Sequence, residues 1–431
     1  MAEHPSRPGL SPRYSRLLRF LLPLVAIIVL LAGCGEGPFC RCSPAVTEHI
    51  SAPNTRPITG LDRALLNAAN GDYPNEGLIL GLAPYDASDG TERLLAVLDG
   101  NLYALPTASG PAALIRKSIC PGGRFPLSDA ASRLACLGSP QVNKDLQLSQ
   151  YGCVDGCFSE QLHIMSFTPT VWPHIRVEQD ISDGRNFLSS PTWRPDGEAI
   201  AALDFASPPV DDISSTHSAS CAIAVYGQAS ADSTDLVPAL RLAVAGFSLC
   251  GALQVAWSPD GKMLAVLDSQ TLLILDAPSP ATIATAIHGG QNVKSAVTAR
   301  FRVVPQQSAR GMAWSPDSHS VAVVSENEVA TGAFRYEMTQ YSIDSSKPSL
   351  SIFGPDDYGG PIGPIAYSTD GRTLIFAAGI REAYALPFRR PLATPGSAYH
   401  PGSFSAQAFR PQICSCPQPP TGLYAYTLPT S

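Results

Sequence analysis

The chain has 431 residues, of which 45% are hydrophobic and only 15% are charged, and this apolar content excludes a globally disordered protein. Its 40 prolines and 35 glycines are typical of many short strands joined by turns and argue against a helical bundle. The first 33 residues carry a net charge of +3, so the remainder of the −7 chain carries −10. An acidic body argues against a nucleic-acid partner, because phosphate contacts need clustered Lys and Arg.

The N-terminus has the pattern of an export signal. Residues 1–19 are polar with four arginines, and Phe20–Ala32 is an apolar run, shorter than the roughly 20 residues of a membrane span. The run leads into Leu31-Ala32-Gly33-Cys34, which resembles the lipobox of bacterial lipoproteins at all four positions. The resemblance implies that Cys34 is acylated, for instance by palmitate, and becomes the mature N-terminus. The body would then be lipid-anchored to the cell membrane and face outside the cytoplasm.

An uncleaved anchor helix over residues 16–32 is the alternative, and it would also place the body outside the cytoplasm. We expect a lipoprotein signal peptide at 1–33, a tether and N-terminal segment at 34–76, and one domain at 77–431. The tether has Gly, Pro and Ser scattered among few apolar positions.

One repeated unit organises the domain, and it is most complete at Val255–Leu267. Trp257 ends a first strand, Ser258–Gly261 form a tight corner, and Met263–Leu267 form a second strand. Proline presets φ in such a corner, and Gly261 tolerates the positive φ that reverses the chain. The unit recurs, with varying fidelity, at four further aromatic anchors: Trp193, Trp314, Tyr367 and Phe409. Degenerate copies precede the apolar stretches 94–98 and 133–137.

The five anchors are 64, 57, 53 and 42 residues apart. Periods of about 40 to 60 residues with three or four strands each are typical of propeller blades. The sequence therefore predicts an all-β fold, a β-propeller of about seven blades, with six or eight as alternatives. The Trp and the Asp-Gly of each corner are expected to be structural, because Trp fills space between blades and Asp binds its own turn.

These Trp-Ser-Pro-Asp-Gly corners resemble the repeats of TolB-type, WD-repeat-like β-propellers, from about Gly77 to the end of the chain. The resemblance implies a rigid disc whose loops and central funnel bind proteins, peptides or small molecules. It implies no particular reaction. No α/β-hydrolase domain follows the repeats, so a prolyl-peptidase-like enzyme is not expected.

Ten of the eleven cysteines remain when Cys34 is set aside, and in an exported protein this even number predicts five disulfides. Spacing suggests three local pairs: Cys120 with Cys136, Cys153 with Cys157, and Cys221 with Cys250. The two C-x-C motifs, Cys40/Cys42 and Cys414/Cys416, are expected to fasten the ends of the ring. Closing such a long loop contributes upward of about 4 kcal/mol in the entropic account. A four-thiolate zinc site at these motifs is the alternative.

Apart from that zinc alternative, no catalytic motif, cofactor site or metal site is recognised in the sequence. His163 and His174, near Trp172 in the sequence, are expected to be packing or solvated residues. The loop 204–217, with Asp211 and Asp212, is the best candidate for a cation or partner contact. A solvated acidic loop is the alternative.

The sequence thus predicts a lipid-anchored, extracytoplasmic propeller that serves as a scaffold for an unidentified protein or small-molecule partner. One alternative is a hydrolase or lyase that acts on saccharides through carboxylates or histidines at the funnel mouth. A purely structural envelope protein is another.

Overall fold

The computed structural model describes residues 54–61, 79–98, 100–120, 127–130, 132–137, 141–142, 158–159, 162–181, 186–206, 221–230, 233–290, 293–303, 308–330, 333–344, 349–353, 362–378 and 422–428. The chain divides into two units, and all the described residues belong to the larger one, Val46–Thr394 with Pro419–Ser431. The smaller unit, Met1–Ala45 with Pro395–Gln418, lies outside the described residues. Within the described part, no helix is long and apolar enough to cross a membrane.

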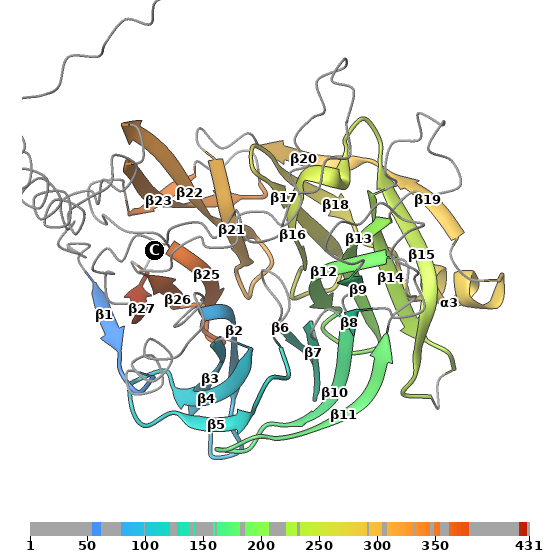
Figure 1. Ribbon diagram of the computed structural model, residues 1–431. Helices are drawn as coiled ribbons and strands as arrows, with labels where there is room; N and C mark the ends of the chain where they lie inside the picture. Colours follow the sequence, from blue (N-terminus) through green and yellow to red (C-terminus); the bar gives the residue numbers. More distant parts are fainter. Residues whose placement is uncertain are drawn as a thin grey trace, which may run out of the picture. The chain divides into compact units, whose positions relative to one another are not determined.

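The larger unit consists of six mainly antiparallel sheets, which are the blades of a propeller (Figure 1). Each begins with an inner strand and adds strands outward. Blade 1 is β2 (Ile79–Asp86), β3 (Glu92–Leu98), β4 (Asn101–Pro106) and β5 (Ala113–Arg116). Blade 2 is β6 (Leu127–Ala130), β7 (Arg133–Leu137), β10 (Leu162–Thr168) and β11 (His174–Ile181). Blade 3 is β12 (Asn186–Trp193), β13 (Ala199–Ala206), β14 (Cys221–Gln228), β15 (Leu236–Val244) and the added β19 (Val293–Val297).

Blade 4 is β16 (Ala252–Trp257), β17 (Met263–Asp268), β18 (Leu272–Asp276) and β20 (Ala299–Val303). Blade 5 is β21 (Ser308–Trp314), β22 (Ser320–Ala330), β23 (Ala333–Ser342) and β24 (Leu350–Phe353). Blade 6 is β25 (Ile362–Tyr367), β26 (Thr373–Ala378), β27 (Gly422–Thr427) and β1 (Thr55–Ile58). A small hairpin, β8 (Gln141–Val142) with β9 (Phe158–Ser159), lies between the second and third strands of blade 2.

The inner strands form a closed ring, because β2, β6, β12, β16, β21 and β25 each contact the next and β25 contacts β2. Apolar residues of the second and third strands fill the space between blades. Leu264 and Val266 face blade 3, whereas Ala265 and Leu267 face blade 5. This alternation has the period of two that a strand packed on both faces requires.

The blade count is six, which corrects the expectation of about seven. Strand β27 pairs directly with β26, Ile375 opposite Ala425, so it is the third strand of blade 6 and not part of another blade. The corner-like Phe409 that suggested a further unit falls in residues 379–421, the connection between these two strands, and outside the described residues.

The ring is closed by the N-terminal segment, part of which was expected to be a tether. Strand β1 is the outer strand of blade 6 and pairs antiparallel with β27, Ile58 opposite Leu423 (Figure 1). The chain then crosses to blade 1, where the Gly110 amide donates to the Thr59 carbonyl at 3.1 Å. Ile58 and Leu61 are buried in the core between the two blades. Blade 6 is therefore built from both ends of the propeller's chain.

Blades 3 and 4 are interlocked by the connection between β18 and β20. Helix α3 (Pro280–His288) starts there, with Ser279 accepting a hydrogen bond from the Thr282 amide and Pro280 in the first turn. It packs on β14 and β15 of blade 3, and β19 then joins that blade parallel to β15. Gly227 permits this contact, because a Cβ there would lie 2.5 Å from Ile283 Cγ2.

Candidate functional site

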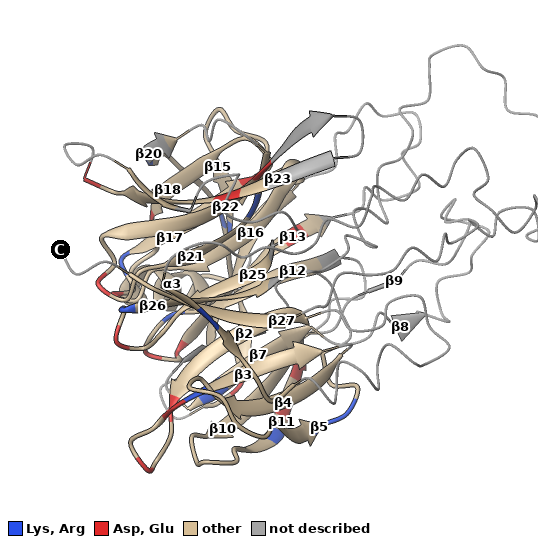
Figure 2. Cartoon of the chain, turned by 90° about the vertical axis from the view of Figure 1, so that its left-hand side faces the viewer, with Lys and Arg blue, Asp and Glu red and all other residues tan. Residues whose placement is uncertain are grey.

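The strand order gives the ring two different faces. The turns between first and second strands, and between third and fourth strands, lie on one face, which we call the corner face. The strand ends at the connections between second and third strands, and at those from blade to blade, form the other, the insertion face. Figure 2 shows many of the Asp and Glu residues at the left, along the corner face.

The corners are closed hydrogen-bonded turns. Ser258 donates to Asp260 Oδ1 at 2.7 Å, while the Lys262 and Met263 amides donate to the Asp260 carboxylate and the Ser258 hydroxyl. Blades 5 and 6 repeat the pattern with the pairs Ser315–Asp317 and Ser368–Asp370. Donation by the Arg372 amide and the Ser368 hydroxyl holds the pKa of Asp370 below its ordinary value. The carboxylates therefore serve their own turns, as the sequence predicted.

The corner tryptophans are also structural in this geometry. Trp257 and Trp314 are 5% and 7% exposed, and each indole N–H donates to a backbone carbonyl at 3.0 Å, of Gly261 and Ala256 respectively. These contacts satisfy the polar edge of a buried ring.

Three pairs of strand ends at the insertion face are joined by long stretches of sequence. Residues 138–161, 207–220 and 379–421 join the second and third strands of blades 2, 3 and 6. The same connection is short in the other three blades: 99–100, 269–271 and 331–332. Since binding residues concentrate on loops held by a rigid scaffold, this asymmetry makes the insertion face the candidate site.

Two buried ion pairs lie where second strands reach this face. In blade 3, Arg241 is ion-paired with Asp204, whose side chain is 2% exposed. In blade 5, Arg310 is ion-paired with Glu326, whose side chain is 5% exposed. A buried carboxylate requires such a partner, because an uncompensated charge in the interior costs several kcal/mol. Neither pair was predicted. Asp204 was expected to begin the loop 204–217, whereas it lies within β13, which continues to Ala206.

Arg310 occupies a β-bulge in the inner strand of blade 5. The register slips there, with Ala309 opposite Ser325 but Gly311 opposite Val324. Bulges re-aim a side chain, and they recur near binding sites. Arg310 remains 23% exposed, so a guanidinium held by Glu326 lies at the inner rim of the insertion face.

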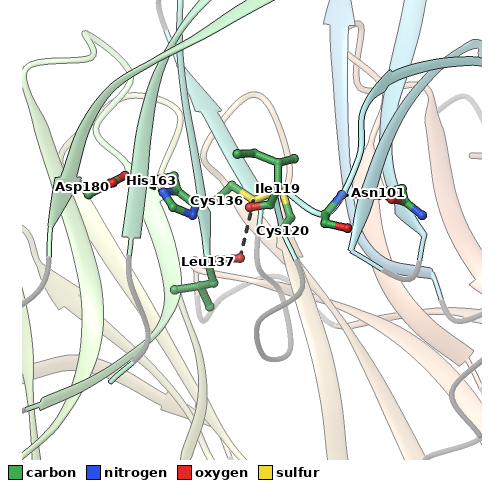
Figure 3. Close-up of a disulfide and its surroundings, with 8 residues drawn as sticks. Asn101, Ile119, Cys120, Cys136, Leu137, His163 and Asp180 are labelled. Atoms are coloured by element: carbon green, nitrogen blue, oxygen red, sulfur yellow. Dashed lines mark hydrogen bonds and ion pairs between the residues drawn. A yellow bond between two sulfur atoms is a disulfide. The ribbon is translucent and has the colours of Figure 1, made fainter. Parts of the chain in front are cut away.

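Two of the predicted cysteine pairs are disulfides, and both lie at the insertion face. Cys120 precedes β6 and bonds to Cys136 in β7, with Cα atoms 5.4 Å apart (Figure 3). Cys221 begins β14 and bonds to Cys250 in the 3-10 turn Leu249–Gly251, with Cα atoms 5.1 Å apart. Each ties a blade-to-blade connection to a strand. The other predicted positions lie outside the described residues: Cys34, Cys40, Cys42, Cys153, Cys157, Cys414, Cys416, Asp211 and Asp212.

The two histidines near Trp172 in the sequence are separated by the fold. His163 lies at the insertion end of β10, opposite Cys136, and its Nδ1 is 2.5 Å from Asp180 Oδ1. Figure 3 shows His163 between Asp180 and the Cys120–Cys136 disulfide. His174 begins β11 at the corner end, two residues after Trp172. In the described part of the chain, no three His, Cys, Asp or Glu side chains are grouped so as to hold a metal ion.

The architecture is therefore that of a six-bladed β-propeller. Matching structures include a hydrazine synthase from Kuenenia stuttgartiensis, at 14% identity and a TM-score of 0.39, with 72% of this chain and 75% of that one covered. A protein assigned as a TolB of Agrobacterium tumefaciens matches at 16% identity and a TM-score of 0.35, covering 68% and 87%. A functionally unknown protein from Desulfotomaculum acetoxidans matches at 14% and 0.37, covering 70% and 80%.

Likenesses at these identities and TM-scores carry no information about the activity of the chain. No protein-family profile matches the sequence, and no curated protein does.

Proposed function

We propose that the chain is a lipid-anchored, extracytoplasmic scaffold that binds a protein partner at the insertion face of its propeller. The observation that supports this most is the asymmetry of the two faces. The corner face is built from short turns whose polar groups bind one another, whereas the strand ends joined by the long connections of blades 2, 3 and 6 are all at the insertion face.

The rim of the insertion face is rigid where it is described. The Cys120–Cys136 and Cys221–Cys250 disulfides and the pairs Asp204–Arg241 and Arg310–Glu326 fix strand ends in three blades. A fixed rim lowers the ordering cost that binding must overcome. The same features suit a binding module with no chemical step.

The tethering half of the proposal rests on the lipobox pattern at Leu31–Cys34. Metabolic labelling with a palmitate analogue in a bacterial host tests it. We expect label on the wild-type chain and none on Cys34→Ala, and label retained by Cys34→Ala would contradict acylation at this site.

The binding half is tested by pull-down from detergent-solubilised membranes with the full lipidated chain. In one variant, residues 207–220 are replaced by Asp-Gly, the two residues that join the same strands in blade 1. We expect a stoichiometric protein partner that this variant no longer recovers, at an unchanged melting temperature. Recovery by both chains would contradict binding through blade 3, and turnover of a glycan by the purified chain would favour an enzyme instead.

A further inference from the structure

Trp172 differs from the other tryptophans of the chain. Trp193, Trp257 and Trp314 are between 3% and 7% exposed, whereas Trp172 is 41% exposed. It lies in the turn between β10 and β11 of blade 2, on the corner face and therefore away from the insertion face. A large aromatic left in water on an ordered turn calls for a functional explanation, because aromatic side chains dominate recognition energetics.

The turn that carries Trp172 is held by the neighbouring blade. The Ser88 amide of blade 1 donates to the Pro169 carbonyl at 2.8 Å, and the Tyr85 hydroxyl donates to the Thr170 carbonyl at 3.3 Å. Tyr85 itself is 4% exposed and packs edge-on against Phe167. The indole is therefore presented by a turn that needs little ordering when a ligand arrives.

One charged side chain of blade 1 lies against this indole, and its own polar partners are on the same turn. The Arg93 guanidinium lies over the ring, 5.6 Å from its centroid, and is 3.6 Å from the Asp89 carboxylate. Thr91 donates to Asp89 through both its amide and its hydroxyl, and accepts a hydrogen bond from Arg93 Nε at 3.2 Å. The result is one exposed aromatic ring with a guanidinium over it, and that guanidinium is bound in turn by a carboxylate and a hydroxyl, so that the two charges balance.

We propose that Trp172, Arg93 and Asp89 form a saccharide-binding site on the corner face. A pyranose has an apolar C–H face that stacks on an indole, and hydroxyls at its edge that bind a guanidinium and a carboxylate. The charge balance of Arg93 and Asp89 suits a neutral, hydroxyl-rich ligand better than an ionic one. This site is separate from the proposed protein-binding face.

A protein partner suits this place less well. A stable protein interface buries roughly 800 Å² on each side and has an apolar centre. Among the described residues, the other large apolar side chains that are exposed are Leu114, Val293 and Leu350, which lie on the outer strands β5, β19 and β24. Trp172 is therefore a single platform and not part of a contiguous apolar patch.

Tryptophan fluorescence tests the proposal directly, because Trp172 is the exposed indole among four. The full mature chain is titrated with chitohexaose, cellohexaose and maltohexaose, with binding confirmed by calorimetry. We expect at least one hexasaccharide to shift the emission saturably, with a dissociation constant on the order of 1 mM. Trp172→Ala should weaken that binding about tenfold, and Trp172→Phe, which keeps an aromatic face, should weaken it less.

Two further variants make the test specific. Arg93→Lys keeps the charge but loses the planar guanidinium, which stacks on aromatic rings and donates paired hydrogen bonds, so it should weaken binding severalfold. Leu350→Ala removes an apolar side chain of similar exposure, 46%, on another blade and should bind as wild type. Absence of binding by all three hexasaccharides, or wild-type affinity in Trp172→Ala, would overturn the proposal. So would a peptide that protects Trp172 from acrylamide quenching where no saccharide does.

Discussion

Thr369 donates its hydroxyl to Asp86 at 2.7 Å, across the seam where the last blade meets the first. Its amide also donates to Glu92 at 2.6 Å. The corresponding corner position is proline in blades 3, 4 and 5. Two of these prolines approach the corner glycine of the next blade: Pro195 of blade 3 approaches Gly261, and Pro316 of blade 5 approaches Gly371. Proline has no N–H to donate. Thr369 therefore makes two hydrogen bonds between blades 6 and 1, where the ring closes, that proline could not make.

Loss of the Thr369 hydrogen bonds should lower the stability of the propeller. We expect Thr369→Val, which loses the hydroxyl but keeps the amide, to lower the free energy of unfolding by about 1 kcal/mol, and Thr369→Pro to lower it by more. Urea denaturation measures both. Ser351→Ala, which removes an exposed hydroxyl from the outer strand β24, is the control and should change little. Equal stability of all three variants would show that the seam does not depend on Thr369.

A side-chain amide makes a paired contact between the inner strands of blades 4 and 5. Gln254 Nε2 donates to the Met312 carbonyl at 3.0 Å, and the Met312 amide donates to Gln254 Oε1 at 2.8 Å. Gln254→Leu leaves both backbone groups without these partners, so we expect a loss of about 1–3 kcal/mol in urea denaturation. Gln179→Leu, which breaks the same paired contact with Leu236 between blades 2 and 3, should have a similar effect. A neutral result for both would refute the role of these amides.

The contact of α3 with blade 3 depends on Gly227. A Cβ at this position would lie 2.5 Å from Ile283 and 3.0 Å from Ile287, so Gly227→Ala must displace the helix. We expect a loss of about 1–3 kcal/mol by denaturant unfolding. Gly251→Ala is the matched control, because nothing lies within 4 Å of its added methyl. Similar stabilities for the two variants would contradict the packing.

The corner carboxylates should make stability depend on acid pH. Hydrogen bonds from the Arg372 amide and the Ser368 hydroxyl lower the pKa of Asp370 from 3.8 in the folded chain. A depressed folded pKa gives stability that is present above about pH 4 and is lost as pH falls through the folded value. Asp370→Asn should therefore show a shallower fall of melting temperature between pH 4 and pH 2.5 than wild type. A steeper fall of the melting temperature in Asp370→Asn would contradict the lowered pKa of Asp370.

The two disulfides should differ little in their contribution. Cys221 and Cys250 are 29 residues apart and Cys120 and Cys136 are 16 apart, which in the entropic account corresponds to about 3–4 kcal/mol each. We expect double Cys→Ser variants of either pair to lose stability on that scale by urea denaturation. Unchanged stability of the Cys221→Ser/Cys250→Ser chain would show that this bridge is absent in solution.

Blades 3, 4 and 5 were predictable because each has a clear tryptophan-containing corner motif. Trp193, Trp257 and Trp314 each precede an apolar second strand, and the structure pairs these strands as the local pattern indicates. The closure was not predictable, because β1 has no corner motif and its partner Leu423 is more than 360 residues from Ile58. The parallel strand β19 was missed for a similar reason, since it joins a blade other than the one its neighbours in sequence belong to.

The candidate site was predictable only in part. Spacing indicated the pairs Cys120–Cys136 and Cys221–Cys250, because each is local. The Arg310–Glu326 pair depends on a bulge in β21, which shifts the register by one residue. The setting of Trp172 depends on a contact between two blades, and neither blade encodes that contact alone.

Photo-crosslinking from defined positions on the two faces tests most directly whether the partner binds at the insertion face. Benzophenone groups are placed at Leu253 or Ser308, in the inner strands near the insertion face, and at Lys262 or Arg372, in the corners. On intact membranes, we expect a protein adduct from the first two positions and none from the corner positions. Adducts to the same protein from the corner positions alone would contradict it.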